Sequence, residues 1–103
     1  MVVNDTLKLD HGTLMRLAGK AARLLRERGA AVPDPDPGDL IVTRDQLGPG
    51  YGHPTPDSEA ALKRAGSEEG LSLDPVYTAK AMAGALAFDA PGPLLFLNTH
   101  GPR

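Results

Sequence analysis

The chain has 103 residues, which is enough for one small domain or a piece of a larger one. Its formal net charge of −2 gives no reason to expect a nucleic acid or an anionic membrane as partner. The absence of cysteine excludes disulfides, thiolate chemistry and cysteine-based zinc sites.

The first predicted helix begins after Asp10, and apolar residues recur at helical spacing from Leu14 to Leu25. Asp10 can cap the start of this helix, and Gly29 can end it. A Pro/Asp-rich segment, residues 31–39, follows. It is predicted to be a loop, because proline breaks helical hydrogen bonding.

Two more helices and short strands are predicted further along the chain. Thr55 followed by a proline starts the second helix, and Gly70 ends it. Asp74 followed by a proline starts a third, which runs to about Phe88. Apolar runs predict strands at residues 40–43 and 94–97, and residues 71–73 form a brief strand or an extended link. This order favours an α/β layer arrangement.

A glycine-rich loop, "GPGYG", surrounds Tyr51. Glycine permits unusual backbone angles and the close approach of a ligand. On composition alone, the simpler interpretation is an ordinary turn whose tyrosine covers the edge of the core.

Three stretches change that interpretation: "GPGYGHPTP", "EGLSLDPVYTAKAMAG" and "LLFLNTHG". In this order and spacing they resemble the C-terminal part of the pyridoxal-phosphate enzymes of the tryptophan synthase β-like fold (fold type II). The branch that they resemble is the aminocyclopropane-carboxylate deaminase and D-cysteine desulfhydrase family. The start of the chain resembles the same family more loosely. The resemblance implies an α/β fold, with residues 1–103 as the C-terminal portion of a three-layer, parallel-sheet large domain.

The resemblance also implies four site residues. Tyr51 and Tyr77 match catalytic tyrosines beside the substrate, where a phenol can donate or accept a proton. Thr78 and Thr99 match cofactor-binding positions near the pyridine nitrogen of pyridoxal 5'-phosphate. A hydroxyl at that nitrogen, in place of a carboxylate, does not hold it protonated. Thr78 therefore favours desulfhydrase-like chemistry over cyclopropane ring opening.

Two parts of such an enzyme are missing from the sequence. The family's cofactor-binding lysine and its phosphate-binding loop both lie upstream of the matched region. Lys20 and Lys63 are expected to face solvent, and Lys8 corresponds to a segment after the cofactor lysine. Lys80 matches a helix lysine of the family that is not the cofactor lysine. Covalent binding of the cofactor by this chain is therefore not expected.

The three histidines and Asp74 are given no definite chemical role. His11, His53 and His100 lack partners at metal-ligand spacing, so no metal site is expected. His53 and His100 flank candidate site residues and could touch the substrate. His100 also stands where the family commonly has glycine, which weakens the match at Thr99. Asp74 is expected to be a helix cap without chemistry.

Large core side chains are scarce, with two Tyr, two Phe and no Trp beside 12 Gly and 10 Pro. An isolated core would be marginal, so the chain is expected to pack against more protein. No window approaches the roughly 18 consecutive apolar residues of a membrane span. The first residues show no basic region followed by an apolar run, so no secretory signal is expected and a cytoplasmic location is the default.

The resemblance implies a fragment of a deaminase or D-cysteine desulfhydrase, a lyase or hydrolase. The intact enzyme would convert a small amino-acid substrate into an α-keto acid and ammonia, and the fragment alone is expected to be inactive. Its expected partner is the missing N-terminal part of the enzyme, and a homo-oligomer is left open. The alternative is a non-catalytic interaction protein or split subunit derived from the same family.

Overall fold

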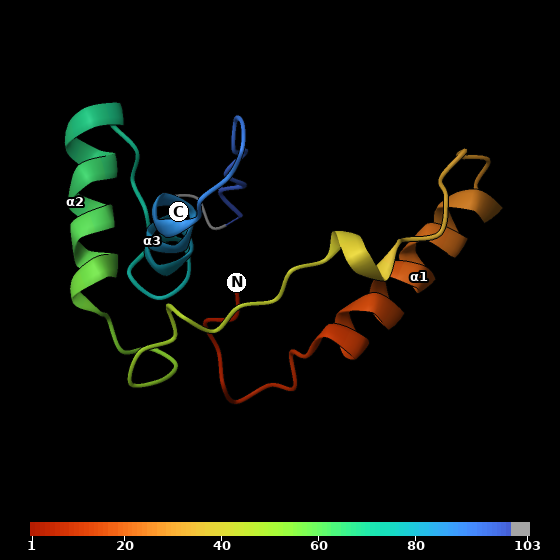
Figure 1. Cartoon of the computed structure of the whole chain (residues 1–103), viewed down its shortest axis with the longest axis horizontal. Coiled ribbons are helices and arrows are strands. Elements are labelled where there is room, and N and C mark those ends of the chain that lie inside the picture. The colour runs from red at the N-terminus through yellow and green to blue at the C-terminus, as the bar shows by residue number, and fades with distance from the viewer. Residues whose placement is uncertain (100–103) are drawn as a thin grey trace. The chain divides into compact units, whose positions relative to one another are not determined.

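A computed structural model describes residues 1–99 of the chain. The helices are α1 (His11–Glu27), the 3₁₀-helix η1 (Pro37–Asp39), α2 (Pro56–Glu69) and α3 (Thr78–Ala87), as Figure 1 shows. The chain divides into two compact units, one formed by residues 1–6 with the segment from residue 43 onward, the other by residues 7–42. Within residues 1–99, none of the helices has the length and apolar character needed to cross a membrane.

In the unit of residues 7–42, α1 begins and ends where the sequence predicts. The carboxylate of Asp10 accepts a hydrogen bond from the backbone N–H of Thr13 at 2.8 Å, which lowers the pKa of Asp10. Beyond the helix, Gly29 adopts a φ of 93°, a left-handed conformation that favours glycine. The Arg26 guanidinium then binds the carboxylate of Asp34 at 2.8 Å, which ties the following segment to α1.

The apolar side of α1 stays largely uncovered. Ala22 is buried, whereas Leu17 and Leu25 are 55% and 48% exposed. The predicted spacing of apolar residues is therefore present, but little of that surface is removed from water.

In the other unit, α2 also matches its predicted bounds. The Thr55 hydroxyl accepts from the N–H of Ser58 at 3.1 Å, and the Ser58 hydroxyl accepts from the N–H of Thr55 at 2.9 Å. This reciprocal pair is a capping box, and it satisfies two N–H groups at the helix start. At the other end, Gly70 adopts a left-handed φ of 64°, and the N–H of Leu71 donates to the carbonyl of Ala65 at 3.0 Å.

The third helix begins later than predicted. The Asp74-Pro75 start lies in a turn that spans residues 75–77, and α3 itself begins at Thr78. Its end at Ala87 agrees with the predicted end near Phe88.

Small side chains form most of the core in this unit. The helices α2 and α3 pack side by side (Figure 1). Ala61 and Ala65 of α2 and Ala83 of α3 are buried. Gly84 lies so close to the side chain of Met1 that a Cβ at this position would collide with it. The scarcity of large side chains noted in the sequence is thus met by close helix packing.

The strands predicted at residues 40–43 and 94–97 do not form within residues 1–99, so these two predictions are wrong for this structure. Residues 71–73 form a link without strand structure, which is one of the two alternatives predicted for them. A strand needs a neighbour to satisfy its backbone groups. At residues 40–43, a backbone hydrogen bond of the strand-pairing type joins the N–H of Val2 to the carbonyl of Thr43, at 2.8 Å. Leu95 and Leu97 are 90% and 75% exposed. The three-layer sheet implied by the resemblance is therefore not confirmed.

Replacing Thr55 by alanine should destabilise the chain by about 1 kcal/mol, because the capping box of α2 loses its hydroxyl acceptor. Thr55→Ser keeps the hydroxyl and should retain most of the stability. The free energy of unfolding in urea compares the two variants, and equal stabilities for alanine and serine would contradict the role of the cap.

Candidate functional site

The two tyrosines of the chain lie together although 26 residues separate them. The hydroxyls of Tyr51 and Tyr77 are 2.8 Å apart, the usual length of an O–H···O hydrogen bond. Their ring centroids are 5.9 Å apart, and the ring planes are tilted by 49°. The convergence of these two phenols, which the family resemblance implies, is thus present in the structure.

Tyr77 is held by the turn that precedes α3. The carboxylate of Asp74 accepts hydrogen bonds from the N–H groups of Val76 at 2.9 Å, Tyr77 at 2.7 Å and Thr78 at 3.1 Å. The Thr78 hydroxyl donates to the same carboxylate at 2.7 Å. The predicted helix cap is therefore displaced, because the N-cap residue of α3 is Tyr77, whose side chain makes no capping hydrogen bond. The Asp74 carboxylate instead holds the turn before the helix and the N–H of Thr78, and this fixes the backbone that carries Tyr77.

The pKa of Asp74 reflects this environment. Its partial burial acts to raise the pKa, but the hydrogen bonds from the Thr78 hydroxyl and from the three N–H groups outweigh it. The pKa of Asp74 is lowered from 3.8 to about 2. The carboxylate therefore stays ionised and keeps these hydrogen bonds throughout the neutral range.

Tyr51 is carried by the glycine-rich loop, which is anchored from two directions. Lys80 of α3 donates from Nζ to the carbonyls of Leu47 at 2.6 Å and Gly50 at 3.1 Å. The carboxylate of Asp5 accepts from the N–H of Tyr51 at 3.2 Å. The loop is thus held by the Lys80 ammonium at two carbonyls and by the Asp5 carboxylate at the N–H of Tyr51.

The tyrosine pair alters the acidity of Tyr77. The hydrogen bond with Tyr51 raises the pKa of Tyr77, with smaller contributions from desolvation and from the negative charge of Asp74. The neutral phenol is therefore the favoured form of Tyr77, and it remains able to donate a proton well above neutral pH.

The two threonines are placed differently from the tyrosines. Thr78 follows Tyr77 directly but is buried, at 2% exposed, and its hydroxyl is engaged with Asp74. Thr99 is exposed in the segment after residue 97. Within residues 1–99, no hydrogen bond joins Thr99 to either tyrosine. Their assignment to the cofactor stays a prediction.

Asp5 and Lys80 were not predicted as parts of the site. Nothing in the sequence links Asp5 to a residue 46 positions away, so its contact with Tyr51 could be found only in three dimensions. Lys80 did leave a signal, because it is a lone charge in a helix of small residues predicted to be buried on most sides.

The described residues do not by themselves fit pyridoxal phosphate. Lys8, Lys20 and Lys63 are exposed, and the Lys80 ammonium is engaged with two carbonyls. In the glycine-rich loop, the N–H of Tyr51 is taken by the Asp5 carboxylate, which would repel a phosphate. No chemical step through the cofactor is therefore assigned to this chain.

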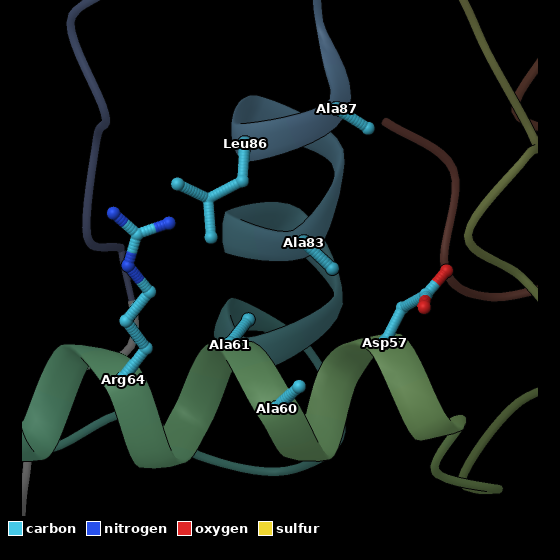
Figure 2. Close-up of a pocket in the computed structure, with 7 residues that line it drawn as sticks. All are labelled: Asp57, Ala60, Ala61, Arg64, Ala83, Leu86 and Ala87. Carbon is cyan, nitrogen blue, oxygen red and sulfur yellow. The ribbon is translucent and has the colours of Figure 1, made fainter.

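A separate groove lies between α2 and α3 (Figure 2). It is lined by Asp57, Ala60, Ala61 and Arg64 of α2 and by Ala83, Leu86 and Ala87 of α3. Neither tyrosine lines it, nor does Thr78 or Thr99. This groove is thus separate from the place where the two tyrosines meet.

The histidines contribute no cluster in the part of the chain that is described. His11 bonds through Nε2 to the carbonyl of Pro37 at 2.9 Å, and His53 is exposed. His100 lies outside the described residues. Among residues 1–99, no group of three or more potential metal ligands is found.

Comparison with known proteins identifies relatives of part of the chain, although no protein-family model matches it. A D-cysteine desulfhydrase of Klebsiella pneumoniae subsp. pneumoniae is 45% identical over 69 residues, which cover 61% of this chain and 21% of that protein. A D-cysteine desulfhydrase of Salmonella newport is 44% identical with the same coverage. The resemblance to this family is confirmed, and the chain spans about a fifth of the length of the curated relatives that it matches.

Replacing Tyr51 by phenylalanine should lower the pKa of Tyr77, because the neutral phenol loses its hydrogen-bond partner. The chain contains no tryptophan, so tyrosinate absorbance follows the two phenols directly. Tyr77→Phe identifies which transition belongs to Tyr77 in the wild-type chain. An unchanged titration of Tyr77 in the Tyr51→Phe variant would contradict the pairing.

The Asp74 network should make stability depend on pH in the acid range. Because the pKa of Asp74 is lower in the folded chain, its stabilisation is complete above about pH 4. It is lost as the pH falls through the folded value of about 2. Unfolding at several pH values should show a weaker acid dependence in Asp74→Asn. Asp89→Asn, which changes an exposed carboxylate, should behave like the wild type, and equal acid dependence in Asp74→Asn would refute the network.

Proposed function

We propose that this chain is a C-terminal portion of a pyridoxal-phosphate-dependent enzyme of the D-cysteine desulfhydrase type and supplies the tyrosine pair of its active site. The observation that carries the proposal is the 2.8 Å contact between the hydroxyls of Tyr51 and Tyr77. Two of the three motifs that carry the resemblance thereby meet at one place. Partial identity to two desulfhydrases supports the same reading.

The chemistry assigned to this chain is substrate binding and proton transfer at the two phenols. In a hydrogen-bonded pair, one phenol donates and the other accepts, so a phenol that gives its proton to the substrate becomes a phenolate that the O–H of its partner stabilises, and this phenolate can later take a proton back. The Tyr51 side chain is 40% exposed, so it can still reach a ligand. The raised pKa of Tyr77 keeps this phenol in its proton-bearing form at neutral pH.

Bound pyridoxal phosphate would supply the electron sink for removing sulfide and ammonia from D-cysteine. Thr78 and Thr99 are the proposed contacts on the cofactor side. Thr78 is buried and held by Asp74, so it would act on the cofactor side through the rigid start of α3. Thr99 is exposed, and the rest of the enzyme would have to hold it in place beside the cofactor.

The proposed partner is the remaining part of the enzyme, which contains the cofactor lysine and the phosphate-binding loop. The relatives are nearly five times as long as the segment they share with this chain. We further propose that residues 94–97 become a strand of a parallel α/β sheet in that complex. The 90% exposure of Leu95 favours this, since a fully apolar run gains most from burial between layers.

The second candidate is a split subunit or a non-catalytic interaction protein derived from the same family. It is favoured by the uncovered leucines of α1 and of residues 94–97, which offer an apolar surface to another chain. This candidate keeps the partner surface but assigns no turnover to the tyrosine pair.

Sulfide release from D-cysteine tests the proposal. The chain alone with pyridoxal phosphate should release none and should show no covalent cofactor adduct on a lysine after borohydride reduction. Mixing it with a D-cysteine desulfhydrase truncated to lack the matched segment should restore release.

The matched control is the same mixture with the Tyr51→Phe, Tyr77→Phe double variant, which should bind the truncated enzyme without restoring release. If the wild-type chain binds the truncated enzyme but the mixture releases no sulfide, the result would favour the interaction protein. Turnover by the chain alone would refute the proposal.

A further inference from the structure

Lys80 is fully buried, at 0% exposed, although its side chain carries a charge. Its Nζ atom donates to the carbonyls of Leu47 and Gly50 at 2.6 and 3.1 Å. Within residues 1–99, no carboxylate forms an ion pair with it. Withdrawing an ammonium from water is costly, and these two hydrogen bonds offset that cost. An apolar side chain of similar length would avoid the cost, so what the lysine adds is its hold on the two carbonyls.

Those two carbonyls lie in the loop that presents Tyr51. The Gly50 carbonyl also accepts from the N–H of His53 at 3.3 Å, which closes a turn with Tyr51 inside it. Gly48 and Gly50 have φ values of 65° and 138°, which glycine adopts readily. The backbone at Tyr51 therefore depends on a carbonyl that Lys80 holds.

The same end of α3 positions the other phenol. Tyr77 precedes the first residue of α3, and Lys80 is the third residue of that helix. The Asp74 carboxylate fixes the backbone of Tyr77, while Lys80 reaches across to the loop of Tyr51. The N-terminal end of α3 is thus linked by hydrogen bonds both to the backbone of Tyr77 and to the loop that carries Tyr51.

We propose that Lys80 is a positioning residue of the tyrosine pair, whose ammonium holds the Leu47 and Gly50 carbonyls and so sets the Tyr51 hydroxyl at hydrogen-bonding distance from that of Tyr77. Asp5 is the second anchor, through the N–H of Tyr51. The inference rests on the proposed function only in treating the pair as the working groups of the site. The two hydrogen bonds from Lys80 to the carbonyls of Leu47 and Gly50, called the clamp below, are a property of this chain itself.

Lys80→Met keeps the length of the side chain and removes its donors. If the clamp sets the pair, the tyrosinate titration of Tyr77 in this variant should shift downward by the same amount as in Tyr51→Phe. Adding Lys80→Met to Tyr51→Phe should produce no further shift, because the contact is already lost. Lys63→Met, which changes an exposed lysine of α2, should titrate like the wild type.

Helical circular dichroism establishes that each variant is folded before it is titrated. Lys80→Arg, which keeps charge and donors, should restore part of the Tyr77 shift. A folded Lys80→Met chain with the wild-type titration would overturn the proposal, as would a shift in the double variant equal to the sum of the single ones.

Should Lys80→Met fail to fold, the wild-type chain provides a direct test by nuclear magnetic resonance. The clamp requires a slowly exchanging Lys80 ammonium with couplings across the hydrogen bonds to the carbonyl carbons of Leu47 and Gly50. A rapidly exchanging ammonium without these couplings would refute it.

These readouts separate the two proposals. A Tyr77 titration that responds to Lys80→Met supports the clamp even when mixtures with truncated desulfhydrase release no sulfide, in which case the proposed function alone fails.

Discussion

The hydrogen bonds at the N-terminal end of α3 determine where the candidate site can form. Asp74 gathers three N–H groups and the Thr78 hydroxyl, which fixes Tyr77, and Lys80 one turn later holds the loop of Tyr51. Both sets of bonds involve an ionised group in a protected setting, where charge-assisted hydrogen bonds are strong. The 2.8 Å contact between the phenols is the outcome of these two supports.

This arrangement gives a small-residue unit a rigid feature that its core alone would not provide. The buried side chains of α2 and α3 are mostly alanines, and each buries little area. Polar interactions with defined geometry therefore contribute much of the order near the tyrosines. The larger apolar surfaces of the chain, on α1 and at residues 94–97, remain in contact with water. Hydrogen bonds at a helix end can hold the site in place without the burial of those surfaces.

The sequence allowed the helices to be predicted, because their signals are local. The matching motifs placed both tyrosines beside the substrate, but the hydrogen bond between their hydroxyls was not among the predictions. Thr55 with its proline and Gly70 bounded α2 correctly. The strands failed for a physical reason: an apolar run such as residues 94–97 forms a strand only beside another strand, and that neighbour is not supplied within residues 1–99. The roles of Asp5 and Lys80 depend on contacts across 46, 33 and 30 residues, which periodicity does not report.

We propose that Tyr51 and Tyr77 act as one hydrogen-bonded unit in a desulfhydrase-type enzyme completed by the rest of its chain. The most direct measurement is sulfide release from D-cysteine by the completed enzyme with each tyrosine changed singly to phenylalanine and with both changed. The double change should reduce the rate no further than the more severe single change, since either one disrupts the unit. Losses that multiply independently, or a single change without effect, would contradict it.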